Sequence, residues 1–145
     1  MVRWISLAPT LNVGCRRSTV SYANQVVSGS SPNHPGASFF RPSEVPLRYD
    51  IGVDKIMWGQ DYPHIEGTYP YTTEALRNTF AGLDVAEVAP MVGLTAIDVY
   101  GFDLDVLEPV AAKVGPTVEE VAVPLEHVPA DSHSIAFAGE NLKPW

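Results

Sequence analysis

The short apolar stretch KIMWG, residues 55–59, constrains the fold of this chain more than any other feature of its sequence. Apolar residues in direct succession, bounded by a lysine and a glycine, are typical of a strand that is covered on both faces, as in a parallel sheet. A similar stretch, ASFF, lies upstream at residues 37–40. We therefore predict two short buried strands at these positions.

The segment between the two strands, 41–52, predicts a short helix. Pro42 suits its first turn, where a missing backbone N–H costs nothing, and Gly52 is a suitable stop. Pro46 lies between them and is expected to interrupt the helix.

Apolar spacing and capping residues predict several helices after residue 71. The first should begin at Thr72 as its N-cap, because Leu76, Phe80 and Leu83 follow with helical spacing. The other expected features are a capping box at Asp84 and Glu87, a kink at Pro90, a helix over 95–100 closed by Gly101, a helix with Pro109 in its first position that ends at Val114, and a capping box at Thr117 and Glu120 followed by a stop at Pro124. Strands that alternate with helices in this way indicate a parallel α/β fold.

Asp61 follows the second predicted strand almost directly. In parallel α/β proteins the functional residues gather where the strands end, at the carboxyl edge of the sheet. Position alone therefore makes Asp61 a candidate site residue. The alternative is structural, since aspartate is also common in turns and at helix caps.

The charge of the chain excludes several classes of function. Its formal net charge is −8, whereas binding to nucleic acid or to an anionic membrane needs a clustered positive field. The sequence contains no apolar run near the roughly 20 residues needed to span a bilayer. Cys15 is the only cysteine, so neither an internal disulfide nor a thiolate metal cluster is expected. We expect a cytoplasmic protein without nucleic-acid or membrane partners.

Three stretches together resemble the carboxyl-terminal end of the metal-dependent hydrolases called amidohydrolase family 2. They are GASFFRPSE from residue 36, IGVDKIMWGQDYPHIEGTYP from residue 51 and GLTAIDVYGFDLD from residue 93. The tail segment EPVAAKVGPTVEEVAVPLEHVPAD looks like the extension found on many actinobacterial members. The resemblance covers roughly residues 36–145 and is strongest around the W-G-x-D-Y-P-H element.

The resemblance implies a (β/α)8 TIM barrel with one divalent metal, usually zinc, at the carboxyl-terminal mouth. Intact members bind it with a His-x-His pair after the first strand, one or two histidines from middle strands and an Asp after the eighth. Asp61 matches the last ligand, so the resemblance assigns it as a metal ligand and as the catalytic proton acceptor. His64, Tyr62 and Trp58 are expected around that ligand rather than on the metal.

The same comparison implies an incomplete barrel. Residues 37–40 match the seventh strand and 55–59 the eighth, and the chain contains no His-x-His pair. We accordingly expect an irregular or disordered lead-in over 1–35, the last two strands with their helices over 36–124, and an extended tail over 125–145. Without the histidine ligands, the isolated chain should lack the metal and be inactive alone.

The aromatic and acidic residues around Asp61 allow two interpretations. Trp58, Tyr62, Tyr69 and Tyr71 could line a pocket for an aromatic ligand, or they could simply fill the barrel end and the base of the loop. Glu66 is either a solvated loop acid or a neighbour of the metal ligands.

Three functional hypotheses follow. The first is a hydrolase in which metal-activated water attacks the carbonyl carbon of a small molecule, with a decarboxylase of carboxylic acids from the same superfamily as the alternative. Either would need the missing strands from another polypeptide. The second is a truncated or misdelimited relic without catalysis, prone to self-association through the open barrel edge. The third is an interaction module that uses the acidic helical tail.

Overall fold

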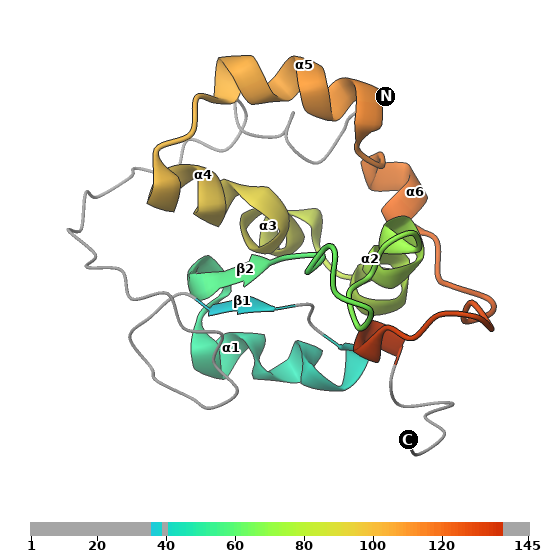
Figure 1. Cartoon of the computed structure of the whole chain (residues 1–145). Coiled ribbons are helices and arrows are strands. Elements are labelled where there is room, and N and C mark those ends of the chain that lie inside the picture. The colour runs from blue at the N-terminus through green and yellow to red at the C-terminus, as the bar shows by residue number, and fades with distance from the viewer. Residues whose placement is uncertain (1–35, 39–40, 138–145) are drawn as a thin grey trace.

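The computed structural model describes residues 36–38 and 41–137 (Figure 1). These residues form a two-stranded parallel sheet and a set of mostly short helices. The α-helices are α1 (Arg48–Ile51), α2 (Thr72–Phe80), α3 (Val85–Ala89), α4 (Thr95–Tyr100), α5 (Leu104–Val114) and α6 (Val118–Ala122). The barrel stays a prediction, because two strands do not establish how a sheet of eight would close.

The two strands lie where the apolar stretches predict them. β1 (Gly36–Ser38) pairs in parallel with β2 (Ile56–Trp58), and Gly36 stands opposite Ile56 in the register. The connection runs through a 3-10 turn, Pro42–Leu47, and then α1. Figure 1 shows α1 on the side of β1, with α3 and α4 on the side of β2.

The connecting helix confirms the role of its proline and glycine. Pro46 lies inside the 3-10 turn, so regular α-helix starts only afterwards, at Arg48. The helix stops at Gly52, whose φ of 103° is a conformation that residues with a Cβ rarely adopt.

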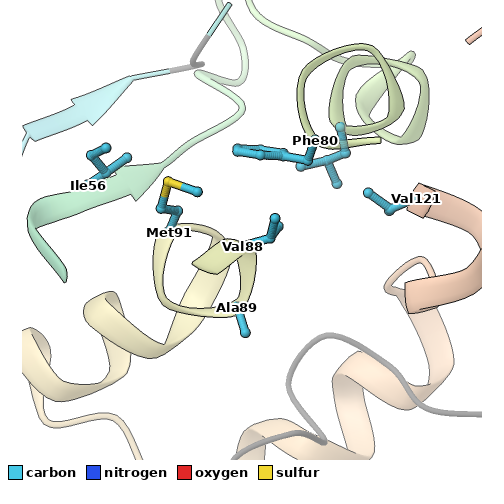
Figure 2. Packing of buried hydrophobic residues seen from close by; sticks show 7 residues of the cluster. Ile56, Phe80, Val88, Ala89, Met91 and Val121 are labelled. Carbon is cyan, nitrogen blue, oxygen red and sulfur yellow. The ribbon is translucent and has the colours of Figure 1, made fainter. Parts of the chain in front are cut away.

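One apolar core holds β2 against the helices. Its buried members are Ile56, Leu76, Phe80, Val88, Ala89, Met91 and Val121. Figure 2 shows Phe80 pointing from α2 toward Met91, while Val121 points from α6 toward Phe80. The core therefore fixes β2, and with it the loop that leaves its carboxyl end.

Several predicted helix boundaries are wrong, for identifiable reasons. Thr72 is the first residue of α2 rather than its N-cap, because its hydroxyl donates to the Gln60 side chain at 3.1 Å instead of capping. Asp84 does cap α3 by accepting from the Ala86 N–H, but Glu87 does not complete a capping box. The Glu87 carboxylate instead accepts hydrogen bonds from the side chains of Arg48 and Tyr49 in α1.

The prediction for Pro109 is wrong, whereas Pro90 does interrupt the regular α-helix. The helical chain continues from α3 through a π-helical turn, Pro90–Leu94, into α4, so Pro90 is accommodated by a wider turn. Pro109 lies inside α5, which begins at Leu104 after the capping residue Asp103. By contrast, the left-handed Gly101 and the Thr117–Glu120 capping box are confirmed.

The segment after α6 contains a packed element near the end of the described residues. A 3-10 turn, Ile135–Phe137, buries Ala136 and Phe137 in a second apolar cluster with Ala75 of α2. The predicted lead-in over 1–35 and the last residues of the predicted tail, 138–145, lie outside the described residues.

None of the helices in the described residues is both long enough and apolar enough to cross a membrane.

Candidate functional site

The loop between β2 and α2 folds back on itself directly after the strand. The N–H of Thr68 donates to the carbonyl of Gln60 at 2.8 Å, and the N–H of His64 donates to the carbonyl of Asp61 at 3.0 Å. Gly67 is required at the closing point, because a Cβ there would lie 2.7 Å from the Gln60 carbonyl oxygen. This closure places the side chains of the loop on a short, curved backbone.

Asp61 has a left-handed backbone conformation, with φ of 58°. Aspartate and asparagine tolerate this region better than most residues with a Cβ. The conformation reverses the chain immediately after β2, so that Asp61 and His64 lie on the same side of the loop.

The loop brings three metal-binding residue types together. The Nδ1 atom of His64 lies 3.1 Å from each carboxylate oxygen of Asp61. With Glu66, each of the three residues offers one ligand atom, and these atoms all lie within 4.8 Å of one another. Asp61 and His64 are open to solvent, with exposed side-chain fractions of 43% and 63%.

The donor set fits a divalent cation of the zinc class. Zinc binds imidazole nitrogen and carboxylate oxygen at about 2.0–2.2 Å, so two ligand atoms on one ion are up to about 4 Å apart. The donor atoms here lie within 4.8 Å of one another, which is wider than that spacing, and rotation of the exposed Asp61 and His64 side chains can shorten it. Asp61, His64 and Glu66 are therefore the described residues that could hold a metal.

A pocket adjoins this cluster. It has a volume of about 310 Å³ and is lined by Tyr62, Pro63, His64, Ile65, Tyr69, Pro70, Tyr71, Asp131, Ser132 and His133. The rings of Tyr62 and Tyr69 meet edge to face at 5.2 Å between centroids. His64 belongs both to the pocket wall and to the metal-binding group, so a ligand in the pocket would lie beside a bound cation.

One wall of the pocket comes from a distant part of the chain. The hydroxyl of Tyr71 donates to the Asp131 carboxylate at 2.7 Å, and this hydrogen bond raises the pKa of Tyr71. A weaker backbone contact, from the N–H of Ile135 to the Glu66 carbonyl at 3.4 Å, joins the same two regions.

The three residues that the sequence predicts around Asp61 have different positions in the structure. His64 contacts Asp61 directly, and Tyr62 lines the pocket. Trp58 packs between the two apolar clusters instead, and its buried indole N–H has no hydrogen-bond partner among the described residues. Trp58 thus supports the base of the loop.

Sequence reasoning missed part of this arrangement. Asp131 and His133 reach the pocket from a segment expected to be an extended tail, and no local pattern in the sequence points to them. Glu66 lies within the cluster, whereas the sequence predicts either a solvated loop acid or a neighbour of the metal ligands. His127 is not part of the cluster or the pocket, and His34 lies outside the described residues.

Comparison with known proteins identifies the family. A family model described as amidohydrolase matches residues 16–102, which is more than half of the chain. The chain therefore belongs to the amidohydrolase family, whose superfamily is generally metal-dependent. No curated protein and no solved structure matches it.

The region that the family model matches contains the possible metal ligands but only part of the pocket. It contains the whole loop with Asp61, His64 and Glu66, and it begins upstream of the resemblance recognised in the sequence. It ends before α5, so the pocket residues Asp131 and His133 lie outside it.

Proposed function

We propose that this chain contributes to a metal-dependent hydrolase that acts on a carbonyl carbon of a small molecule. The observation that supports the proposal is the position of Asp61 in the matched region, directly after a parallel strand and in contact with His64. A bound divalent metal, most simply zinc, would supply water with a pKa near 7.

The residues of the chain have distinct roles in this proposal. The Asp61 carboxylate would bind the cation and would accept the proton of the attacking water as the water oxygen adds to the carbonyl carbon and the C=O π bond opens. When the carbonyl re-forms, the bond from that carbon to the leaving group breaks, and the leaving group takes the proton from Asp61. His64 donates to that carboxylate and holds its orientation. The pocket beside them positions the substrate, and its tyrosines suit a flat or aromatic group.

We further propose that β1 and β2 are the seventh and eighth strands of a (β/α)8 barrel. Their parallel pairing and the position of the loop at the carboxyl end of β2 are consistent with this arrangement. The histidines expected from other strands would then come from another polypeptide, because His34 is the one histidine of the sequence outside the described residues.

Decarboxylation is the second candidate reaction, and the aromatic lining of the pocket favours it. Tyr62 and Tyr69 are 64% and 65% exposed and could stack on an aromatic carboxylic acid, which would leave its carboxylate near Asp61 and His64. In this reaction the C–C bond to the carboxylate breaks, carbon dioxide leaves, and a proton takes its place on the carbon.

Turnover of two probes tests these proposals in the full chain supplied with zinc. Hydrolysis of 4-nitrophenyl acetate that depends on zinc and is lost in Asp61→Asn, but kept in the matched exposed variant Asp50→Asn, supports the hydrolase. Release of carbon dioxide from 2,6-dihydroxybenzoate with the same variant pattern supports the decarboxylase. Turnover retained in Asp61→Asn contradicts the role of Asp61 in either reaction.

We also propose self-association as a function of this chain that needs no catalysis. The sequence predicts self-association through the open barrel edge, and the described residues offer a further surface along α5. This surface consists of Val106, Val110 and Val114 of α5 together with Phe102, which lies two residues before the helix. The four residues follow one another at four-residue intervals, and all are more than half exposed. We call these four residues the α5 stripe.

The α5 stripe suits a second copy of the chain. No residue of α5 is buried, and Figure 1 shows the helix at the periphery of the molecule, beyond α4. Pairing of two such stripes would bury on the order of several hundred Å² per copy, the size of a weak interface. We therefore expect a weak and concentration-dependent dimer.

A further inference from the structure

We infer that the pocket beside the loop binds a small organic cation of the alkylammonium class. Three properties of the lining carry the inference: exposed aromatic rings, one carboxylate from a separate segment of the chain, and no lysine or arginine among the described residues that line the pocket. If the pocket holds the substrate of the proposed hydrolase, the inference rests on that function and adds that the substrate carries an ammonium group beside its carbonyl. Binding itself needs neither a metal nor turnover.

Tyr62 and Tyr69 form two walls of an aromatic corner. Their ring planes meet at 77°, with 5.2 Å between the centroids. Both residues are well exposed, so part of each ring stays open to a ligand. The face of an aromatic ring attracts a cation that lies within about 6 Å of its centroid. Two nearly perpendicular rings can therefore contact one ammonium group from two sides, as in the aromatic cages that bind quaternary ammonium ions.

The carboxylate of Asp131 supplies a negative charge to the same pocket. The Tyr71 hydroxyl donates to its Oδ1 atom at 2.7 Å, which leaves the Oδ2 atom for an ammonium ion. A second carboxylate, that of Asp61, contacts the lining residue His64 from outside the pocket. With a net charge of −8, the field of the whole chain also favours a cationic ligand over an anionic one.

The wall that carries Asp131 is fixed to α2 on both sides. Before it, the Arg77 guanidinium donates to the carbonyl of Pro124 at 2.9 Å. After it, the Asn78 amide donates to the carbonyl of Ala136 at 3.3 Å, and Ala136 is completely buried. The same helix begins where the tyrosine-containing loop ends, so it holds both walls in place before a ligand arrives. Binding to such a preformed pocket loses less conformational entropy than binding to a mobile one.

The size and charge of the pocket distinguish between possible ligands. Its volume of about 310 Å³ is at the lower end of the range for small-molecule sites, which suits a compact ion such as choline. An aromatic carboxylate, the substrate of the alternative decarboxylase, would meet the negative charge of Asp131 when no metal is present. Choline and benzoate therefore give opposite expectations for the metal-free chain.

The test is an NMR titration of the full, isotope-labelled 145-residue chain with choline chloride, in the presence of a chelator. The amide signals of residues 62–71 should shift. The neutral isostere 3,3-dimethylbutan-1-ol, titrated with an equal concentration of sodium chloride, should bind at least about threefold more weakly, because it has the shape of choline without the charge. Benzoate should bind no better than this isostere.

Variants of the lining residues separate the rings from the charge. Tyr62→Leu and Tyr69→Leu should each weaken choline binding about threefold, whereas Tyr62→Phe and Tyr69→Phe keep the ring and should restore it. Asp131→Asn should weaken binding by a similar factor, because it removes the charge while its amide oxygen can still accept from the Tyr71 hydroxyl. The exposed control Asp50→Asn should leave binding unchanged.

Several results would overturn the inference. They are the absence of choline binding, equal binding of the neutral isostere, unchanged binding in both leucine variants, equal loss in the leucine and phenylalanine variants, and binding of benzoate in place of choline. Because these titrations contain no free metal, choline binding without zinc-dependent turnover contradicts the proposed hydrolase alone. Turnover without choline binding contradicts the cation site alone. Circular dichroism confirms that each variant is folded.

Discussion

The imidazole Nδ1 of His64 lies 3.1 Å from both carboxylate oxygens of Asp61, three residues earlier in the chain. Both carboxylate oxygens therefore contact the same nitrogen atom, and this contact orients the Asp61 carboxylate toward the imidazole ring. This arrangement depends on the reversal of the chain at Asp61 and on the closure at Gly67. Both backbone features give direct predictions for the stability of the loop.

Substitution of Asp61 should affect stability according to the backbone tolerance of the new residue. A left-handed conformation costs most residues with a Cβ about 1–2 kcal/mol, and glycine and asparagine are exceptions. We expect Asp61→Ala to be less stable than Asp61→Asn by about 1 kcal/mol, and Asp61→Gly to be at least as stable as Asp61→Ala. Urea unfolding followed by circular dichroism measures this order, and equal stabilities of all three variants would contradict the left-handed assignment.

Gly67→Ala should destabilise the protein by about 1–3 kcal/mol, as overpacking does elsewhere. The added Cβ would lie 2.7 Å and 2.8 Å from the carbonyl oxygens of Gln60 and Asp61, which belong to the backbone and cannot rotate away. Gly59→Ala is the matched control, because a Cβ at Gly59 meets nothing within 4 Å. Equal midpoints for both variants in urea would show that the loop does not close as described.

The fold near these positions was predictable where the signal is local. The apolar stretches predict β1 and β2 to within a few residues, and Gly52 and Gly101 end their helices as expected because both need a positive φ. The Thr117 hydroxyl accepts from the Glu120 N–H, and the Glu120 carboxylate accepts from the Thr117 N–H. Both bonds lie within one turn, so this capping box could be recognised from spacing alone.

Prediction failed where a distant partner competes for the same side chain. The Glu87 carboxylate accepts from the Arg48 guanidinium at 2.9 Å and from the Tyr49 hydroxyl at 2.8 Å, rather than completing a cap on its own helix. These residues are almost forty positions apart, and the sequence pattern contains no sign of the contact.

In the candidate site, too, the residues near one another in sequence could be predicted and the distant ones could not. Asp61 could be identified from its place after a strand, and His64 from its proximity in sequence. The pocket could not be predicted, since Asp131 and His133 reach it only after the chain has passed through α5 and α6. Their position depends on packing of the later 3-10 turn against α2, which a local pattern does not encode.

Phe80→Ala should cost about 3–5 kcal/mol, because it leaves a cavity in the centre of the larger core. The side chain is 2% exposed and lies among Ile56, Met91 and Val121. Phe80→Leu should cost less, since it keeps most of the apolar volume. The difference in urea midpoint between the two variants measures the cavity contribution, and no difference would mean that the core closes around the shorter side chain.

The ion pair at the start of the connection predicts a small loss of stability in acid. A hydrogen bond from the Arg41 side chain lowers the pKa of Glu44 below its ordinary value of 4.5, although partial burial opposes the shift. A lowered folded-state pKa stabilises the protein above the unfolded-state pKa, and this contribution is lost as pH falls through the folded-state value. Both side chains are about one third exposed, so the effect should be below about 1 kcal/mol.

Glu44→Gln tests this pH dependence. The variant lacks the ionisable group, so its stability should fall less than that of the wild type between neutral pH and pH values below 4.5. Urea midpoints across that range provide the measurement. Parallel profiles for the two proteins would show that the pair contributes nothing.

The α5 stripe predicts a weak dimer whose formation depends on salt. Two copies of a chain with a net charge of −8 repel each other, and added salt screens that repulsion while leaving apolar contact intact. We therefore expect sedimentation analysis to show more dimer at high protein concentration and at high ionic strength. Val110→Asp should shift the equilibrium to monomer, because it places a charge in the centre of the stripe. Ala112→Asp, which adds the same charge on the opposite side of α5, should leave the dimer intact, and equal loss in both variants would assign the effect to net charge rather than to the stripe.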